Sequence, residues 1–490
     1  MKLSFHGHDE KYAVEQSMLS LFPGEKPVYS PIQPGEDNWA EVTLHETADR
    51  CQAQVALCRG GKTARQTLDA PLSGDDFQRE GIRRRAIGRC FFLAARQVLD
   101  RDPPWGMLTG VRPVKLPTRF LKAGQREEQV RDTLIRDYYI SPRRTDLAMD
   151  CAKASLAVGK DLRDDQVSLY IGIPFCPTRC AYCSFVSADV HKALKLVPSY
   201  VEALLGELDA TGQALSKAGL TIHSLYMGGG TPTTLSAEHL DQVLTRAEQV
   251  LPLDRCIEYT VEAGRPDTIT MDKLNVLSRH GIGRISINPQ TLEDHVLAAI
   301  GRKHDAGAIF DAFAMARAVG FDCINADLIA GLPRDSEEGF RRSLDGMLEL
   351  GAENITVHTL ALKKGSALMT RDQGGTLPPG DEVARMLDYS LDTLRGAGYA
   401  PYYLYRQKYM SGALENVGWA LPGKESVYNI VMMEELQSVI SAGGGGVTKL
   451  VDPKTGRILR LPNPKYPHDY MELYPKVLSQ KEDILDFYRG

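Results

Sequence analysis

The chain has 490 residues, of which 43% are hydrophobic and 25% are charged, with a formal net charge of −5. This length suits two or three domains of an ordinary globular protein, and the negative charge argues against nonspecific binding to nucleic acid. No apolar run approaches the roughly 20 residues of a membrane span, and the first residues lack the order of a signal peptide. Since nine cysteines, an odd number, do not indicate a disulfide framework, we expect a cytoplasmic location.

Residues 1–160 are predicted to form an α+β accessory domain that carries no cofactor motif. Apolar and polar residues alternate over three segments, 39–45, 51–58 and 62–68. This alternation indicates a small antiparallel sheet. Apolar residues at helical spacing predict a long helix over 75–100, and two polar-faced helices should follow over 127–158.

A loop over 105–115 contains Gly and Pro residues that restrict its shape, and it holds Arg112 and Lys115 close together. Two neighbouring cations of this kind suit the binding of an anionic substrate. A loop that docks one domain onto another is an equally good interpretation.

Residues 161–395 alternate between strand-like and helix-like segments. The predicted strands are 168–173, 224–227, 257–262, 284–287, 322–329 and 354–358, and helical patterns such as 200–218 separate them. Repeated βα units of this spacing predict an α/β fold with a parallel sheet, which we expect to curl into a partial barrel. Reactive groups of such a fold lie at the carboxyl ends of the strands.

Three cysteines, Cys176, Cys180 and Cys183, follow the first predicted strand on one loop. Their sulfurs can all face one small inorganic core, and thiolate is the ligand that iron–sulfur clusters require. Since the loop offers no fourth cysteine at this spacing, a four-iron cluster would keep one iron open to another molecule. A zinc site and ordinary buried thiols are the alternatives for this motif taken alone.

The pattern C-x-x-x-C-x-x-C, with the aromatic Tyr182 before its last cysteine, resembles the signature of the radical S-adenosylmethionine (SAM) superfamily. The resemblance implies a (β/α)6 partial barrel that binds a [4Fe-4S] cluster through Cys176, Cys180 and Cys183. It also implies that SAM binds the open iron through its amino and carboxylate groups. An electron from the reduced cluster would then cleave SAM to a 5′-deoxyadenosyl radical.

Further motifs follow the order of that superfamily along the barrel. Consecutive glycines at 228–230 let the backbone approach a ligand closely, although a plain glycine turn is the alternative. A carboxylate such as Glu262 at a strand end can accept hydrogen bonds from ribose hydroxyls or from an ammonium group. The charge of Asp327 interrupts an apolar run and needs a partner. The resemblance implies SAM contacts for Tyr170, Tyr182, Gly229, Gly230, Thr231, Glu262, Gln290, Arg302 and Asp327. His304 is interpreted as a second layer or substrate contact, or as a helix-capping residue.

Residues 396–490 are predicted to form a C-terminal cap that binds substrate. Aromatic residues and cations interleave over 401–410, which suits a flat, anionic, conjugated ligand, although an aromatic core strand with exposed charges is the alternative. A helix is predicted over 432–441, before a glycine run that either admits a ligand or forms a turn. Because buried carboxylates need cations, the candidates for binding them are Arg112, Arg406 and Lys408.

Taken with the segment 357–366, these features closely resemble the HemZ-type oxygen-independent coproporphyrinogen III oxidases over essentially the full length. The resemblance implies oxidative decarboxylation of two propionates of coproporphyrinogen III to vinyl groups, giving protoporphyrinogen IX. It implies a tetrapyrrole substrate and a flavodoxin or ferredoxin-type electron donor. Established members of the wider family have a further cysteine at the position of Phe185. A phenylalanine at this position resembles the heme-chaperone branch instead. A heme-binding chaperone and a different radical reaction on a tetrapyrrole therefore stay open.

Overall fold

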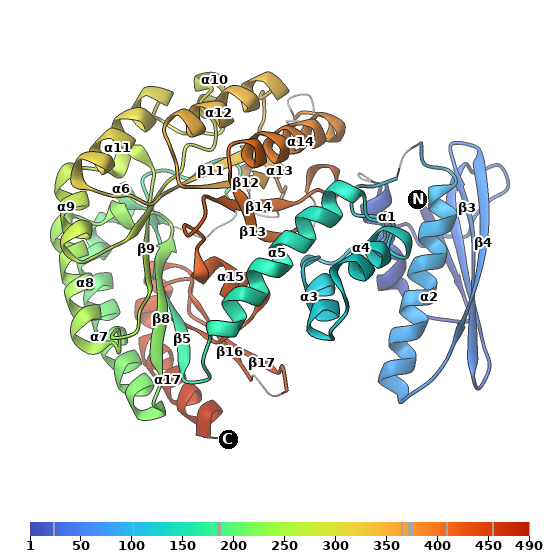
Figure 1. Ribbon diagram of the computed structural model, residues 1–490, viewed down its shortest axis with the longest axis horizontal. Helices are drawn as coiled ribbons and strands as arrows, with labels where there is room; N and C mark the ends of the chain where they lie inside the picture. The colour runs from blue at the N-terminus through green and yellow to red at the C-terminus, as the bar shows by residue number, and fades with distance from the viewer. Residues whose placement is uncertain are drawn as a thin grey trace. The chain divides into compact units, whose positions relative to one another are not determined.

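The computed structural model in Figure 1 describes residues 1–22, 25–100, 102–183, 188–363, 366–370, 377–407, 410–452 and 455–489. The chain divides into two compact units, one made of Met1–Met149 with Gly412–Leu414 and the other of Asp150–Ser411 with Glu415–Gly490. The division at residues 160 and 395 stays a prediction. Within the described ranges, every helix is too short or too polar to cross a membrane.

The first unit is built on a four-stranded sheet with its strands in chain order. The strands are β1 (Lys2–His6), β2 (Asn38–Glu46), β3 (Arg50–Arg59) and β4 (Lys62–Pro71). β1 is parallel to β2, and the other pairs are antiparallel. Alternate residues of β3 are buried with the apolar side of the helix α2 (Asp76–Arg96), as the period of two in the sequence indicates. The three predicted strands and the long helix are therefore confirmed.

The other helices of this part of the chain are α1 (Lys11–Leu21), α3 (Lys115–Lys122), α4 (Glu127–Arg136) and α5 (Pro142–Asp161). Helix α2 begins with a capping box, in which Asp75 accepts from the backbone N–H of Gln78 and the Gln78 side chain accepts from the backbone of Asp75. The reciprocal bonds satisfy two backbone donors that a helix leaves unpaired at its start.

The second unit is built on an eleven-stranded sheet whose centre is parallel. Six neighbouring parallel strands are, in spatial order, β5 (Gln166–Ile173), β8 (Thr221–Gly229), β9 (Glu258–Gly264), β10 (Arg284–Ile287), β11 (Ile324–Ala330) and β12 (Asn354–Thr359). These six strands confirm the six predicted ones. The sheet ends in two edge strands, β13 (Ala400–Tyr405) and β17 (Ile458–Pro462), so the described strands form an open sheet instead of a closed barrel.

The C-terminal part of the chain extends this sheet on both sides. β14 (Asn416–Ala420) pairs antiparallel with β12 and with β13. On the other side, β15 (Val439–Gly443) pairs parallel with β5, and β16 (Val447–Val451) and β17 follow as antiparallel strands. The helix predicted over 432–441 is wrong: α15 (Val427–Glu434) ends where Glu435 takes a φ of +56°, and β15 begins four residues later.

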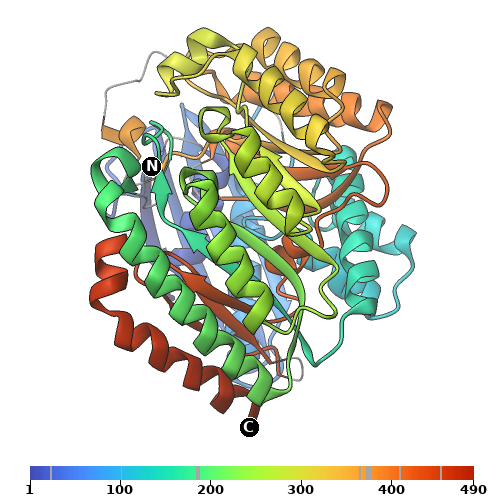
Figure 2. The ribbon, with the colours of Figure 1, turned by 90° about the vertical axis from the view of Figure 1, so that its left-hand side faces the viewer.

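Helices connect the parallel strands and cover the outer face of the sheet (Figure 1). The connecting helices are α7 (Val197–Ala218), α8 (Ala237–Val250), α9 (Met271–Arg279), α10 (Asp294–Ala299), α11 (Ala306–Val319) and α12 (Glu337–Glu349), and α14 (Gly380–Gly396) follows the last parallel strand, β12. The last helix, α17 (Tyr474–Arg489), lies along α7 (Figure 2). A buried carboxylate joins these parts, because Glu207 of α7 lies 2.7 Å from Nζ of Lys481 on α17 and accepts from Asn463 at 2.9 Å.

Candidate active site

A cavity of about 290 Å³ lies at the carboxyl ends of the parallel strands. The predicted site residues that line it are Cys176, Cys180, Cys183, Tyr182, Gly229, Gly230, Thr231, Glu262, Gln290, Arg302 and Asp327. They come from the cysteine loop and from the ends of four further strands or the loops that follow them. The structure therefore brings together all but one of the residues predicted to hold the cluster and SAM.

The cysteine loop lies beside the glycine turn that follows β8. Cys176 belongs to a two-residue strand, β6 (Phe175–Cys176), paired with β7 (Ala188–Asp189), and its sulfur lies 3.6 Å from Oγ1 of Thr231. The backbone N–H of Ala181 donates to the carbonyl of Ile300 at 2.9 Å. These contacts hold the loop between the turn after β8 and the end of α10.

The glycine turn requires residues without a side chain. Gly229 has a φ of +112°, a conformation that favours glycine. A Cβ on Gly230 would lie 2.3 Å from the carbonyl oxygen of Phe175, and the N–H of Gly230 donates to the carbonyl of Ile173 at 2.8 Å. The turn therefore packs directly against the backbone that leads into the cysteine loop.

Two carboxylates line another part of the cavity. Burial raises the pKa of Glu262 to about 7, although Oε1 of this residue accepts from the hydroxyl of Tyr226 at 2.6 Å. The pKa of Asp327 is lowered despite its burial, because His358, at 3.7 Å, and Asn325, which donates at 2.9 Å, stabilise the anion. At neutral pH, Asp327 is thus ionised while Glu262 titrates.

Buried guanidinium groups lie on the cysteine side. Arg302 donates to the carbonyl of Asn288 at 2.6 Å and to the hydroxyl of Tyr182 at 3.2 Å. Burial lowers the pKa of Arg302, but Tyr182 and Cys180 raise it above its ordinary value, so the group stays charged. Arg265 is also buried, and its Nη1 lies 3.9 Å from the sulfur of Cys180.

Two buried polar atoms in the wall of the cavity have no hydrogen-bond partner among the described residues, namely Oδ1 of Asn288 and Nε of Arg302. Buried polar groups are usually paired, so unpaired atoms in a cavity wall indicate a polar ligand. Thiols and cations at one side, with carboxylates at another, fit a metal cluster together with a zwitterionic sulfonium such as SAM.

Tyr170 is the one predicted SAM contact that does not line the cavity. Its ring stacks with those of Tyr226 and Tyr428, at centroid distances of 6.3 Å and 6.4 Å. A Cβ on Gly229 would lie 3.2 Å from its hydroxyl. The geometry thus makes Tyr170 a support for the glycine turn.

Of the three predicted substrate cations, only Arg406 can be placed relative to this cavity. Arg406 is buried, and burial lowers its pKa to about 10 while Glu415 opposes the shift. It does not line the cavity, although its neighbours Tyr405 and Gln407 do. Arg112 belongs to the first unit, and Lys408 lies outside the described residues. Their role in binding substrate stays a prediction.

Sequence reasoning missed several residues of the cavity. Arg265, His358, Lys363 and Asn416 all line it. The signal that could have found Arg265 is its position three residues after Glu262, at the end of the same strand. His304, whose side chain is 2% exposed, instead lies beside the carboxylate of Asp267, 4.0 Å away, and burial lowers its pKa to about 4.

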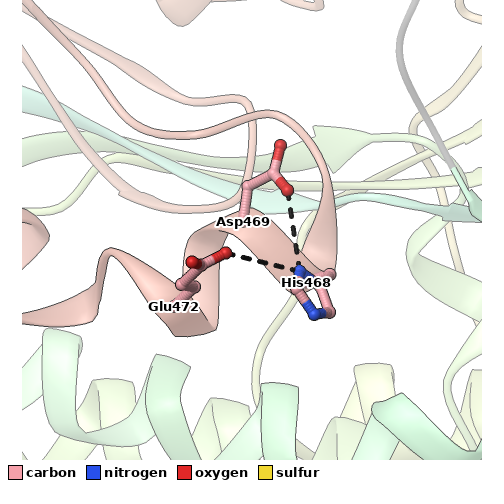
Figure 3. Close-up of side chains that lie close together, drawn as sticks. All are labelled: His468, Asp469 and Glu472. Atoms are coloured by element: carbon pink, nitrogen blue, oxygen red, sulfur yellow. Dashed lines mark ion pairs between the residues drawn. The ribbon is translucent and has the colours of Figure 1, made fainter.

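A larger hollow of about 780 Å³ lies at the amino ends of β9, β10 and β11, and its wall contains none of the predicted site residues. On α16 (Pro467–Glu472), His468 lies 3.7 Å from both Asp469 and Glu472 (Figure 3). All three side chains are exposed, and exposed acidic groups commonly lie together without a metal.

The fold and the cysteine loop define a radical SAM protein, and residues 170–346 match the family model described as the Radical SAM superfamily. The chain is 41% identical over 385 residues to the oxygen-independent coproporphyrinogen-III oxidase-like protein HemZ of Bacillus subtilis, an overlap that covers 78% of this chain and 77% of that protein. The chain therefore belongs to the HemZ family of radical SAM proteins. This superfamily uses a [4Fe-4S] cluster and SAM.

Two other proteins are similar to this chain. The heme chaperone HemW of Escherichia coli is 30% identical over 320 residues, which cover 65% of this chain and 78% of that protein. The solved structure of the coproporphyrinogen III oxidase HemN from Escherichia coli, described as a radical SAM enzyme, matches with a TM-score of 0.51 and 23% identity. It covers 66% of this chain and 72% of that one. This structural match confirms the fold.

Proposed function

We propose that this protein is an enzyme that oxidatively decarboxylates propionate side chains of coproporphyrinogen III to vinyl groups. In this proposal Cys176, Cys180 and Cys183 bind a [4Fe-4S] cluster and SAM occupies the rest of the cavity. The observation that carries the proposal is the single cavity that three cysteines share with two carboxylates and two buried guanidinium groups. The similarity to a coproporphyrinogen-III oxidase-like protein supports the choice of substrate.

When bound and reduced, the cluster supplies the electron that cleaves SAM and yields the radical that abstracts hydrogen. The protein's own task is to hold SAM in one orientation. Arg302 offers a fixed cation for the SAM carboxylate, and Asp327 offers a carboxylate that stays ionised at neutral pH. The glycine turn brings backbone groups close to the ligand, because Gly229 and Gly230 have no side chain to prevent it.

The test is an anaerobic assay of the reconstituted protein with reductant, SAM and coproporphyrinogen III, in which 5′-deoxyadenosine and porphyrin products are measured together. We expect both deoxyadenosine and a product with vinyl groups. Cys183→Ala should abolish SAM cleavage, whereas Cys256→Ala, a thiol outside the site, should retain it. Full cleavage in the Cys183 variant would refute the cluster assignment.

A heme chaperone is the second candidate, favoured by the similarity to HemW and by Phe185, the residue type that the heme-chaperone branch carries at this position. The chaperone function would be supported, and the oxidase rejected, if two results came together. The protein would bind heme tightly, as followed by optical absorption, and it would cleave SAM without decarboxylating coproporphyrinogen. Mass analysis of the tetrapyrrole product would reveal a different radical reaction.

A further inference from the structure

Arg265 is a buried arginine in the wall of the cavity that no step of the proposed function uses. Its side chain is 4% exposed. Its Nη1 donates to Oγ1 of Thr178 at 2.8 Å and to the carbonyl of Thr178 at 3.3 Å, and it lies within hydrogen-bonding range of the Cys180 sulfur at 3.9 Å. This guanidinium group therefore contacts the cysteine loop at one of the three predicted cluster ligands.

The direction of this guanidinium group is fixed by a carboxylate behind it. Nε and Nη2 of Arg265 donate to the two oxygens of Asp267, at 2.9 Å and 2.8 Å. Such a two-point pair holds the planar group in one orientation and leaves Nη1 on the opposite side. Consequently Nη1 of Arg265 faces Cys180, and the carboxylate of Asp267 contacts the opposite edge of the guanidinium group.

The three cysteines differ in their surroundings. Cys180 is 8% exposed, whereas Cys176 and Cys183 are more accessible. Cys180 also interacts with the second buried guanidinium group, that of Arg302. Positive charge in a region of low dielectric stabilises an added negative charge strongly. The reduction of a cluster adds one electron, so a cation at a ligand sulfur favours the reduced form.

We propose that Arg265 donates an N–H···S hydrogen bond to the cluster ligand Cys180 and thereby raises the reduction potential of the cluster. Hydrogen bonds to the sulfurs are one of the features that set the potentials of iron–sulfur clusters. The inference rests on the proposed binding of a cluster by this loop. Arg265 acts through Cys180 and is therefore a positioning residue, not a catalytic one.

The experiment is a redox titration of the reconstituted full-length protein, with dithionite as reductant and the reduced cluster followed by electron paramagnetic resonance. The variants are Arg265→Gln, which removes the charge, and Arg265→Lys, which keeps a charge but cannot make all the bonds of the planar group. Arg284→Gln is the matched control. Arg284 is also buried, but it donates to the carbonyls of Lys424 and Glu425 at the other end of the sheet.

We expect the midpoint of the Arg265→Gln variant to become more negative. At the potential where half of the wild-type cluster is reduced, the ratio of reduced to oxidised cluster in this variant should be about tenfold lower. This ratio corresponds to a midpoint potential about 59 mV more negative for a one-electron couple. Arg265→Lys should shift the midpoint less, and Arg284→Gln should leave it unchanged.

An unchanged midpoint in Arg265→Gln, with the wild-type iron content, would overturn the proposal. It would also be overturned if both Arg265 variants failed to hold a cluster that Arg284→Gln holds, because Arg265 would then serve to build the loop. A wild-type protein without a cluster signal would instead refute the proposed function on which the inference rests.

Discussion

Replacing Glu262 with glutamine should stabilise the SAM-free protein at pH 8, although it removes a predicted SAM contact. Burial, assisted by Asp327, raises the pKa of this carboxyl group from an ordinary 4.5 to about 7. Because the folded state binds the proton more tightly than the unfolded chain, the free energy of unfolding falls as the pH rises from 4.5 to 7. A rise of about 2.5 pK units corresponds to about 3 kcal/mol lost above pH 7. Glutamine does not ionise and still accepts from the hydroxyl of Tyr226.

The measurement is urea unfolding of both proteins at pH 5 and pH 8, followed by circular dichroism. The stability of Glu262→Gln relative to wild type should increase by about 2 kcal/mol between the two pH values. Glu202→Gln, at an exposed position of α7, is the control for replacing a carboxylate outside the cavity. A flat difference for Glu262→Gln, or one that falls with pH, would refute the reasoning.

Three further predictions concern the site and its support. Tyr226→Phe removes a hydrogen bond that lowers the pKa of Glu262. The pH dependence of SAM affinity, measured by calorimetric titration, should therefore move upward by about 1 to 2 pH units. An unchanged pH profile would contradict this prediction. Lys481→Met leaves the buried carboxylate of Glu207 without its ion-pair partner. The free energy of unfolding, measured by urea titration, should therefore fall by about 3–5 kcal/mol. An unchanged free energy of unfolding would mean that the pair is dispensable. Gly230→Ala places a methyl group 2.3 Å from a carbonyl oxygen and should weaken SAM binding at least about tenfold in the same calorimetric assay.

The control for the glycine substitution is Gly283→Ala. Gly283 lies just before β10, has no positive φ, and would have no heavy atom within 4 Å of an added Cβ. Wild-type SAM affinity in Gly230→Ala would show that the turn can move away from the cysteine loop.

The parallel strands were predictable because each is a short apolar run with helical periodicity on either side. The predicted segment 224–227, for example, lies within β8. The C-terminal strands were not predictable in this way. The pattern over 432–441 suits a helix, but Glu435 ends α15 in a left-handed conformation and Val439 pairs with Ser168, about 270 residues earlier. Pairing over such a distance leaves no local signal in the sequence.

The site was predictable where a motif carries it and not where distant residues meet. The cysteine spacing and the glycine turn are local patterns, and both line the cavity. Thr178 and Cys180, which Arg265 contacts, lie more than 80 residues away in the sequence, so the local pattern around Arg265 does not reveal these contacts. The stacking that draws Tyr170 away from the cavity likewise involves Tyr428, which belongs to a late helix.

The position of β15 also has a consequence for synthesis of the protein on the ribosome. One side of β5, the strand that leads into the cysteine loop, finds its partner only when residues 439–443 have emerged. At about 5–20 residues per second, the intervening chain takes roughly 15 to 55 seconds to make. During that time β5 is a strand edge with unpaired backbone groups. A nascent chain that loses its C-terminal strands should therefore be prone to aggregation.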